Sequence, residues 1–116
     1  MALSFTVLPG PWETVIRARG DIDPAAAAAL DEQLTHAADY GITIIVDLSE
    51  VRTLEPVGLS VLYRAQSRCR AREGDLVLVV PQLELLRVLQ AAGLAEVFDI
   101  RMSTSHASPR SVLNRR

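Results

Sequence analysis

Four residues, Glu55, Pro56, Val57 and Gly58, stand where a predicted strand ends and a predicted helix begins. Such a junction leaves several backbone N–H groups free at the helix start, and these groups often serve an anion or a reactive side chain. None of the four residues has a hydroxyl, thiol or imidazole, so the junction has no nucleophile of its own. Glu55 as the cap and Pro56 as the first helical residue instead make a sound helix start. We therefore expect this junction to bind a partner rather than to catalyse a reaction.

Two carboxylates, Asp21 and Asp23, could form a pair for acid–base chemistry or metal binding. Asp23 directly precedes Pro24, however, and this order is typical of a helix cap followed by the first helical residue. Metal ligation needs further donors at a recognisable spacing, and the sequence has none. It also lacks a glycine-rich phosphate loop and a nucleophile elbow. The sequence therefore predicts no enzyme activity, no cofactor and no metal site.

Hydroxyl and guanidinium groups flank the junction. Thr53 is expected in the loop before it, as a hydrogen-bonding residue, and Ser60 on the polar face of the helix after it. Phosphorylation of either hydroxyl is the alternative. Arg64, Arg68 and Arg72 recur every four residues along the same helix. This spacing is typical of a solvated helix face, and the alternative is a basic strip that steers an acidic partner.

Hydrophobic periodicity predicts the elements that position these residues. Alternating apolar and polar residues indicate two strands around a turn at the start of the chain, and later apolar runs indicate buried strands. The predicted strands are 3–7, 13–20, 42–48, 75–80 and 96–102, and the predicted helices are 24–40, 57–72 and 81–92. The order β-β-α-β-α-β-α-β predicts an α/β fold with a mixed, mostly parallel sheet.

Four side chains outside the junction carry further expectations. Trp12 in the hairpin turn is expected to cover the open end of the core, and the alternative is an anchor for a binding partner. Tyr63 and Cys69 are expected on the buried face of the second helix, where the thiol serves packing alone. Asp47 is expected at the end of the central strand, where it could join the two aspartates described above electrostatically.

Length and composition limit the classes of protein. The chain has 116 residues, 49% of them hydrophobic, and a formal net charge of −2. These values predict one globular domain, which we place at residues 1–102, followed by a flexible tail at 103–116. The near-neutral charge argues against nucleic-acid binding. No apolar run reaches the ~18 residues of a membrane span and no signal peptide is recognisable, so we expect a cytoplasmic protein without membrane insertion.

Three stretches together resemble the STAS domain of bacterial anti-sigma factor antagonists, over roughly residues 3–100. The first is RGDIDPAAA, from Arg19 to Ala27. The second is IIVDLSEVRTLEPVGLSVLYRA, and the third is GDLVLVVPQLELLRVLQAAGLAEVFDI. They are similar to the family's turn before the first helix, its central strand with the second helix, and its closing elements. The resemblance implies a STAS-like single domain that binds a partner protein.

In phosphorylatable family members the junction reads Asp-Ser-Ser-Gly, and a kinase that is also the anti-sigma factor phosphorylates the second serine. The unphosphorylated antagonist binds that kinase and a sigma factor is released, whereas the phosphorylated antagonist dissociates. By position, Val57 takes the place of that serine, and valine has no group that accepts a phosphoryl. The resemblance therefore implies a regulator that docks on an anti-sigma factor of the serine kinase type, without the usual phosphoswitch.

The resemblance also implies which residues contact the partner. These are Asp21, Asp23, Glu55, Pro56, Val57, Gly58, Ser60 and Arg64. Two alternatives stay open. STAS domains also serve as small subunits of lipid-trafficking ABC transporters, and a degenerate module could act as a competitor or scaffold in a sigma-factor network. The sequence leaves the oligomeric state open.

Overall fold

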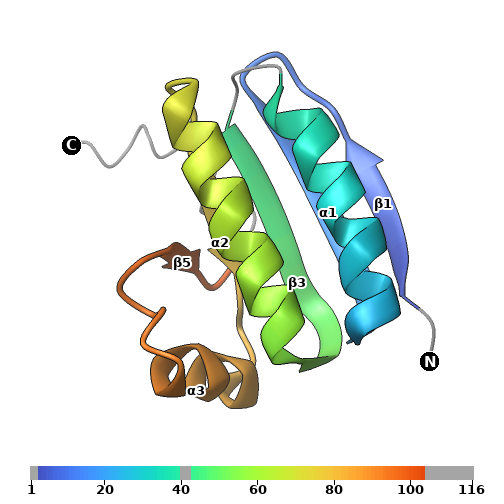
Figure 1. Cartoon of the computed structure of the whole chain (residues 1–116), viewed down its shortest axis with the longest axis vertical. Coiled ribbons are helices and arrows are strands. Elements are labelled where there is room, and N and C mark those ends of the chain that lie inside the picture. Colours follow the sequence, from blue (N-terminus) through green and yellow to red (C-terminus); the bar gives the residue numbers. More distant parts are fainter. Residues whose placement is uncertain (1–2, 40–42, 104–116) are drawn as a thin grey trace.

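The computed structural model describes residues 3–39 and 43–103, whose arrangement is shown in Figure 1. In these residues strands and helices alternate in the predicted order, which confirms the fold class. The strands are β1 (Ser4–Leu8), β2 (Glu13–Ile22), β3 (Thr43–Leu54), β4 (Leu76–Val79) and β5 (Asp99–Arg101). The helices are α1 (Pro24–Ala38), α2 (Pro56–Ala71) and α3 (Leu83–Ala91). The helix stop predicted at Gly41, and the predicted tail beyond Ser103, lie outside the described residues.

The strands form one sheet in the order β1-β2-β3-β4-β5. β1 and β2 are antiparallel because a tight turn joins them, and the other neighbours are parallel because a helix connects each pair. Helices α1 and α2 lie side by side across one face of the sheet, and α3 lies near the start of α2 (Figure 1). Strands β2 and β3 therefore run next to each other into the starts of α1 and α2.

A large, mostly aliphatic core fills the space between the sheet and the helices. The sheet contributes Ile16 and Leu78, and the helices contribute Leu30 and Leu62, all fully shielded from solvent. Burial of this kind is the main stabilising contribution in a domain of this size. Cys69 also lies in the core, as predicted. Burial raises the pKa of its thiol to about 11, so the thiol stays protonated and packs as a small apolar group.

β3 is longer than predicted, and this corrects two expectations. Its second half stays paired with β2, with Asp21 opposite Thr53 and Ile22 opposite Leu54, so the strand continues to Leu54. Thr53 therefore lies in a strand, and its predicted place in a loop is wrong. Asp47 lies inside the strand rather than at its end.

Two aromatic side chains that were predicted to be buried are exposed. Trp12 is 82% exposed, because the turn between β1 and β2 extends past the end of the core. Tyr63 is 49% exposed, because it follows the buried stripe residue Leu62 by one position and points to the flank of α2. Both rings are therefore available for contacts outside the core.

Helix α3 begins at Leu83, later than the start predicted at Pro81. Gln82 stays extended as the cap residue. Its side-chain amide donates hydrogen bonds to the carbonyls of Leu48 and Val51 over 2.7 and 2.9 Å. These bonds hold the residue against β3, so the helix starts only after it.

Candidate partner-binding site

The turn before α1 and the junction before α2 lie side by side at one end of the sheet. The backbone N–H of Glu55 donates to the carbonyl of Ile22 over 3.1 Å and fixes the end of β3 to the end of β2. The Thr53 hydroxyl donates to Asp21 Oδ1 over 3.1 Å in the same pair of strands. The structure thus brings together Asp21, Asp23 and Glu55, which are far apart in the sequence.

No side chain caps the start of α2. Glu55 has an extended backbone, with φ −82° and ψ 162°, and its carboxylate makes no hydrogen bond to the helix. Its carbonyl accepts hydrogen bonds from the N–H groups of Gly58 and Leu59, at 2.8 and 3.3 Å. Pro56 occupies the first helical position, where its missing N–H has no cost. The helix start is therefore well formed by its backbone and remains accessible to a partner.

Gly58 lies buried directly beneath this surface. A Cβ atom at this position would lie 2.7 Å from both Ile22 Cγ2 and Leu54 Cδ1, far closer than non-bonded carbon atoms pack. The missing side chain therefore lets α2 begin directly against the paired ends of β2 and β3. Gly58 shapes the surface by packing, and its exposed neighbours make the side-chain contacts available to a partner.

Val57 and Ser60 lie on the outer side of the first helical turns. Val57 is 40% exposed, so the position predicted to correspond to the phosphorylated serine of the family presents an isopropyl group to solvent. Ser60 is also exposed, and its hydroxyl donates to the carbonyl of Pro56 over 3.4 Å. This bond is the common back-bond of a helical serine. The exposed surface of the junction is therefore mainly apolar.

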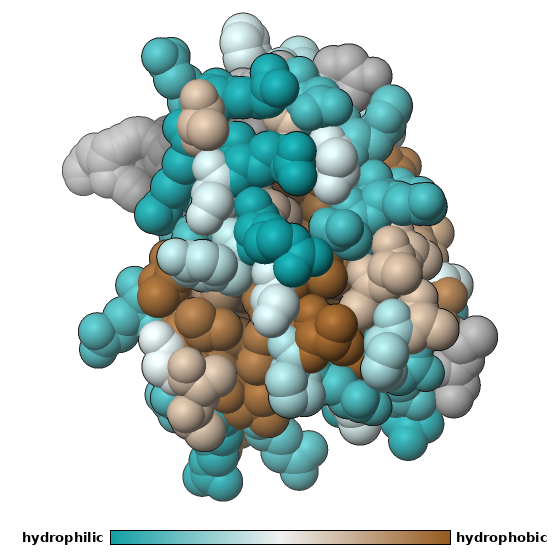
Figure 2. Space-filling view, viewed as in Figure 1, coloured by the Kyte–Doolittle hydropathy of each residue, from teal (hydrophilic) through white to brown (hydrophobic). Residues whose placement is uncertain are grey.

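Four large apolar side chains on α2 and α3 are exposed. Val57, Tyr63, Leu83 and Val88 are between 37% and 57% exposed, and we call them the α2–α3 patch. Figure 2 shows hydrophobic side chains gathered over α3 and the first half of α2, and hydrophilic ones over the second half of α2. Exposed apolar side chains of this kind are common at protein–protein interfaces.

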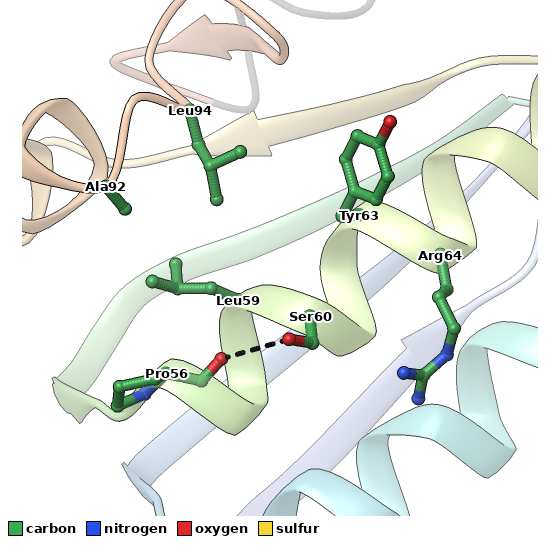
Figure 3. Close-up of a pocket in the computed structure, with 7 residues that line it drawn as sticks. All are labelled: Pro56, Leu59, Ser60, Tyr63, Arg64, Ala92 and Leu94. Atoms are coloured by element: carbon green, nitrogen blue, oxygen red, sulfur yellow. Dashed lines mark hydrogen bonds between the residues drawn. The ribbon is translucent and has the colours of Figure 1, made fainter.

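A pocket of about 550 Å³ opens beside the α2–α3 patch (Figure 3). It is lined by Pro56, Leu59, Ser60, Tyr63, Arg64, Ala92 and Leu94. Figure 3 shows Ala92 and Leu94 on one wall and the residues of α2 on the other, with the hydroxyls of Ser60 and Tyr63 as polar groups and the Arg64 side chain directed toward α1. The volume and the mixed lining suit an apolar side chain of a partner with a polar group next to it.

The arginines of α2 pair with carboxylates of α1. Arg64 lies 3.8 Å from Asp31, and Arg72 lies 3.6 Å from Asp39. These pairs are exposed, so each contributes little to stability. They nevertheless neutralise two of the three arginines of the predicted strip, which favours a solvated helix face over a strip that steers an acidic partner.

Asp47 does not join this site, contrary to expectation. Its carboxylate is 5% exposed, and it accepts hydrogen bonds from Arg17 Nε at 3.0 Å and from the Ser49 N–H at 2.9 Å. Burial alone would raise its pKa, but the hydrogen bonds from Ser49 and Arg17 outweigh burial and hold the pKa below the ordinary value of 3.8. Asp47 therefore acts as a buried tie between β2 and β3.

Catalytic and metal chemistry find no support in the described part of the chain. Within it, no group of three or more His, Cys, Asp or Glu side chains is placed to hold a metal ion. No helix there has the length and hydrophobicity needed to cross a membrane. The described structure at the junction combines a helix start without a side-chain cap, exposed apolar side chains and a neighbouring pocket.

Comparison with known proteins identifies the family of the chain. The STAS domain model matches residues 3–107. The chain is 31% identical over 83 residues to the anti-sigma-B factor antagonist of Listeria monocytogenes, covering 71% of this chain and 73% of that protein. It is 28% identical over 109 residues to the anti-sigma-F factor antagonist RsfA of Mycobacterium tuberculosis, covering 91% and 85%. The structure of the anti-sigma factor antagonist SpoIIAA in its unphosphorylated form has the same fold, with a TM-score of 0.80, 20% identity and coverage of 93% and 96%.

The chain therefore belongs to the STAS domain family. Its relatives within that family are anti-sigma factor antagonists, which are regulators and not enzymes. The family and the class of regulator agree with the resemblance found in the sequence.

Sequence patterns missed part of the pocket. Tyr63 follows Ser60 by three residues, and this spacing, which places both on one helix face, was the available signal. Ala92 and Leu94 have no local signal. They lie next to α2 only because α3 lies near the start of α2. Periodicity along a single element does not predict such a tertiary contact.

Proposed function

We propose that this chain acts as an anti-sigma factor antagonist: it docks on an anti-sigma factor of the serine kinase type and so influences the release of a sigma factor. One observation carries the proposal. Val57 is exposed at a helix start that no side chain caps, and the neighbouring residues Pro56 and Leu59 line a pocket. In a chain similar to antagonists of anti-sigma factors, such a surface supports docking of a protein.

The expected contact surface is the junction with the turn beside it. Asp21, Asp23 and Glu55 form its acidic side, and Pro56, Val57 and the pocket form its apolar side. Ser60 and Arg64 lie at the pocket edge. A partner that fits this surface presents an apolar anchor next to a basic group, because both halves of the surface are then satisfied.

We further propose that the usual phosphoswitch is absent at this position. A phosphoryl group adds about 1.5–2 negative charges and dissociates a complex through repulsion and the cost of desolvation. The isopropyl group of Val57 cannot carry one. The complex is therefore expected to persist when ATP is present.

Mixing the protein with the serine-kinase anti-sigma factor of its own organism, with and without ATP, tests both parts. We expect one complex in gel filtration, equally stable in both conditions, and no phosphate on residues 53–60. The matched variant Val57→Ser is expected to gain a phosphoryl and to dissociate when ATP is added. Phosphate on Thr53 or Ser60 of the unaltered chain would contradict the missing switch, and failure to form any complex would contradict the docking.

A second pair of variants locates the surface. Val57→Asp introduces a charge into the apolar side of the junction and is expected to weaken the complex by about tenfold or more. Ser67→Asp makes the same charge change at an exposed position further along α2 and is expected to leave affinity unchanged. Equal losses of affinity in the two variants would show that the partner does not contact the junction.

A further inference from the structure

The outer edge of β1 is open. β1 is the first strand of the sheet order, and in the described part of the chain it pairs only with β2 (Figure 1). An edge strand presents a row of N–H and C=O groups that can pair with another strand. Proteins usually protect such edges with charges, proline, bulges or very short strands.

The two edges of this sheet differ in protection. β5, at the opposite edge, has only three residues, and two of them are the ion pair of Asp99 and Arg101 at 2.8 Å. β1 has five residues and contains neither charge nor proline, and its register with β2 is unbroken from Ser4 to Leu8. The first twelve residues of the sequence include no charged side chain at all. β1 is thus the edge that remains able to accept another strand.

Exposed apolar side chains accompany this edge. Val7 is 42% exposed, Leu8 is 47% exposed, and Trp12 in the adjoining turn is 82% exposed. A tryptophan this exposed is typical of an interface anchor, because it offers a large contact area with few rotatable bonds. These residues belong to the hairpin, and the α2–α3 patch belongs to other elements near the opposite end of the sheet order.

We propose that two copies of this chain pair through antiparallel β1 strands and form a two-fold dimer with a continuous sheet. Pairing centred on Thr6 sets Phe5 of one copy opposite Val7 of the other, so apolar side chains meet in both directions and no charges oppose each other. The same surface on both copies satisfies the requirement of an isologous interface.

The charges on β2 favour this orientation. Glu13 stands at the turn end of the hairpin, and Arg19 stands opposite Ser4 at the other end. In an antiparallel dimer the Glu13 end of one copy lies beside the Arg19 end of its partner copy. A parallel arrangement would place like charges side by side, which electrostatic complementarity disfavours. These charges lie one strand behind the edge, and Arg19 already lies 3.4 Å from Glu50, so the antiparallel pairing depends mainly on the uncharged, self-complementary register of β1.

The size of the interface sets its strength. Stable dimers bury about 1,200–2,000 Å² in total, and two paired strands of five residues reach the low end only if the hairpin side chains contribute. An aromatic side chain such as Trp12 adds about 150–250 Å². The dimer is therefore reversible and depends on concentration. Its contacts are made by β1 and the adjoining turn, and α2 is not among the elements that pair.

Sedimentation velocity of the whole chain over a wide concentration range tests the proposal. We expect a monomer at low concentration that shifts to a dimer as concentration rises. Thr6→Lys places two like charges opposite each other at the two-fold axis and is expected to leave only monomer. Ser67→Lys makes the same change on exposed α2 and is expected to dimerise like the unaltered chain. Thermal unfolding of both variants verifies that they remain folded.

Cross-linking tests the geometry independently. Thr6→Cys is expected to form a disulfide-linked dimer under mild oxidation, because the two thiols face each other, whereas Ser67→Cys is not. The native Cys69 is fully buried and does not interfere. A chain that stays monomeric at every concentration, or a dimer indifferent to Thr6→Lys, would overturn the proposal. The proposal would also be wrong if the chain were monomeric and Thr6→Lys abolished its binding to a different protein. The edge of β1 would then be the binding site of that protein.

Discussion

The starts of α1 and α2, at the end of the sheet, share one sequence pattern but differ in how they are capped. Each has an apolar residue, an acidic residue and a proline: Ile22-Asp23-Pro24 before α1 and Leu54-Glu55-Pro56 before α2. The carboxylate of Asp23 accepts a hydrogen bond from the N–H of Ala26 at 2.9 Å. The carboxylate of Glu55 makes no such bond. The start of α1 therefore has a side-chain cap, and the start of α2 has none.

One methylene group explains the difference. The short side chain of aspartate reaches the third N–H of its own helix, whereas glutamate is a poor cap because its carboxylate lies further from the backbone. The third helical residue differs as well, since α1 has Ala26 there and α2 has the buried Gly58. α2 is thus built to sit close against the sheet while its outer surface stays open, which is what a docking helix requires.

The largest expected effect is at Gly58. Gly58→Val places atoms where Ile22 and Leu54 already lie, at 2.7 Å from a Cβ, and is expected to destabilise the fold by about 3 kcal/mol. Denaturant unfolding measures this change, and partner binding should fall with it because the start of α2 is displaced. The reciprocal variant Ala26→Gly costs only the helix propensity of glycine, at most about 1 kcal/mol. Equal losses at the two positions would show that the close packing of α2 is not special.

The second effect concerns Asp47, which ties β2 to β3. Asp47→Ala removes the buried bonds to Arg17 and Ser49 between and beside β2 and β3, and is expected to cost about 2 kcal/mol at neutral pH. Because the change affects the strands that lead into both helices, it should lower global stability without selecting one start. A loss confined to partner binding, with unchanged unfolding, would contradict this role.

The same residue predicts a dependence on pH. The pKa of Asp47 in the folded chain lies below its ordinary value of 3.8, so the unfolded chain takes up the proton first as pH falls. The stabilisation is therefore complete above about pH 4 and is lost as pH falls through the lower folded-state pKa. The difference in unfolding free energy between the unaltered chain and Asp47→Ala should shrink below about pH 4. A constant difference down to strong acid would refute the assignment.

The sequence predicted what depends on neighbours along the chain. The period of apolar residues found every strand and helix, and the Asp23–Pro24 order found the cap of α1. Contacts between elements were not predictable in the same way. The length of β3 depends on pairing with β2, which is why Thr53 was misplaced. The exposure of Trp12 depends on where the core ends, and no local sequence pattern predicts the end of the core.

The candidate site was likewise predictable only in part. Its junction residues were found from their order in the sequence and from a family resemblance. The wall formed by Ala92 and Leu94 was not, because it results from the position of α3 in space. The requirement for glycine at position 58 was likewise visible only once Ile22 and Leu54 were known to lie against it.

The smallest expected effects test the comparison of the caps most directly. Asp23→Ala removes the bond to Ala26 and is expected to cost about 1 kcal/mol. Glu55→Ala removes no cap bond and is expected to change the unfolding free energy by less than about 0.5 kcal/mol. Glu55→Asp shortens the side chain to the length that caps α1, so it should stabilise α2 by a few tenths to about 1 kcal/mol. Denaturant midpoints of the three variants measure these changes.

The variant Glu55→Asp also separates stability from function. If the uncapped carboxylate at position 55 serves the partner, a shorter carboxylate that turns back to cap the helix should weaken binding while the chain itself becomes more stable. Isothermal titration with the anti-sigma factor, set beside the unfolding data, checks that opposition. A variant that gains stability and binds equally well would show that the missing cap has no part in docking, and the contrast between the two helix starts would then be one of packing at Gly58 alone.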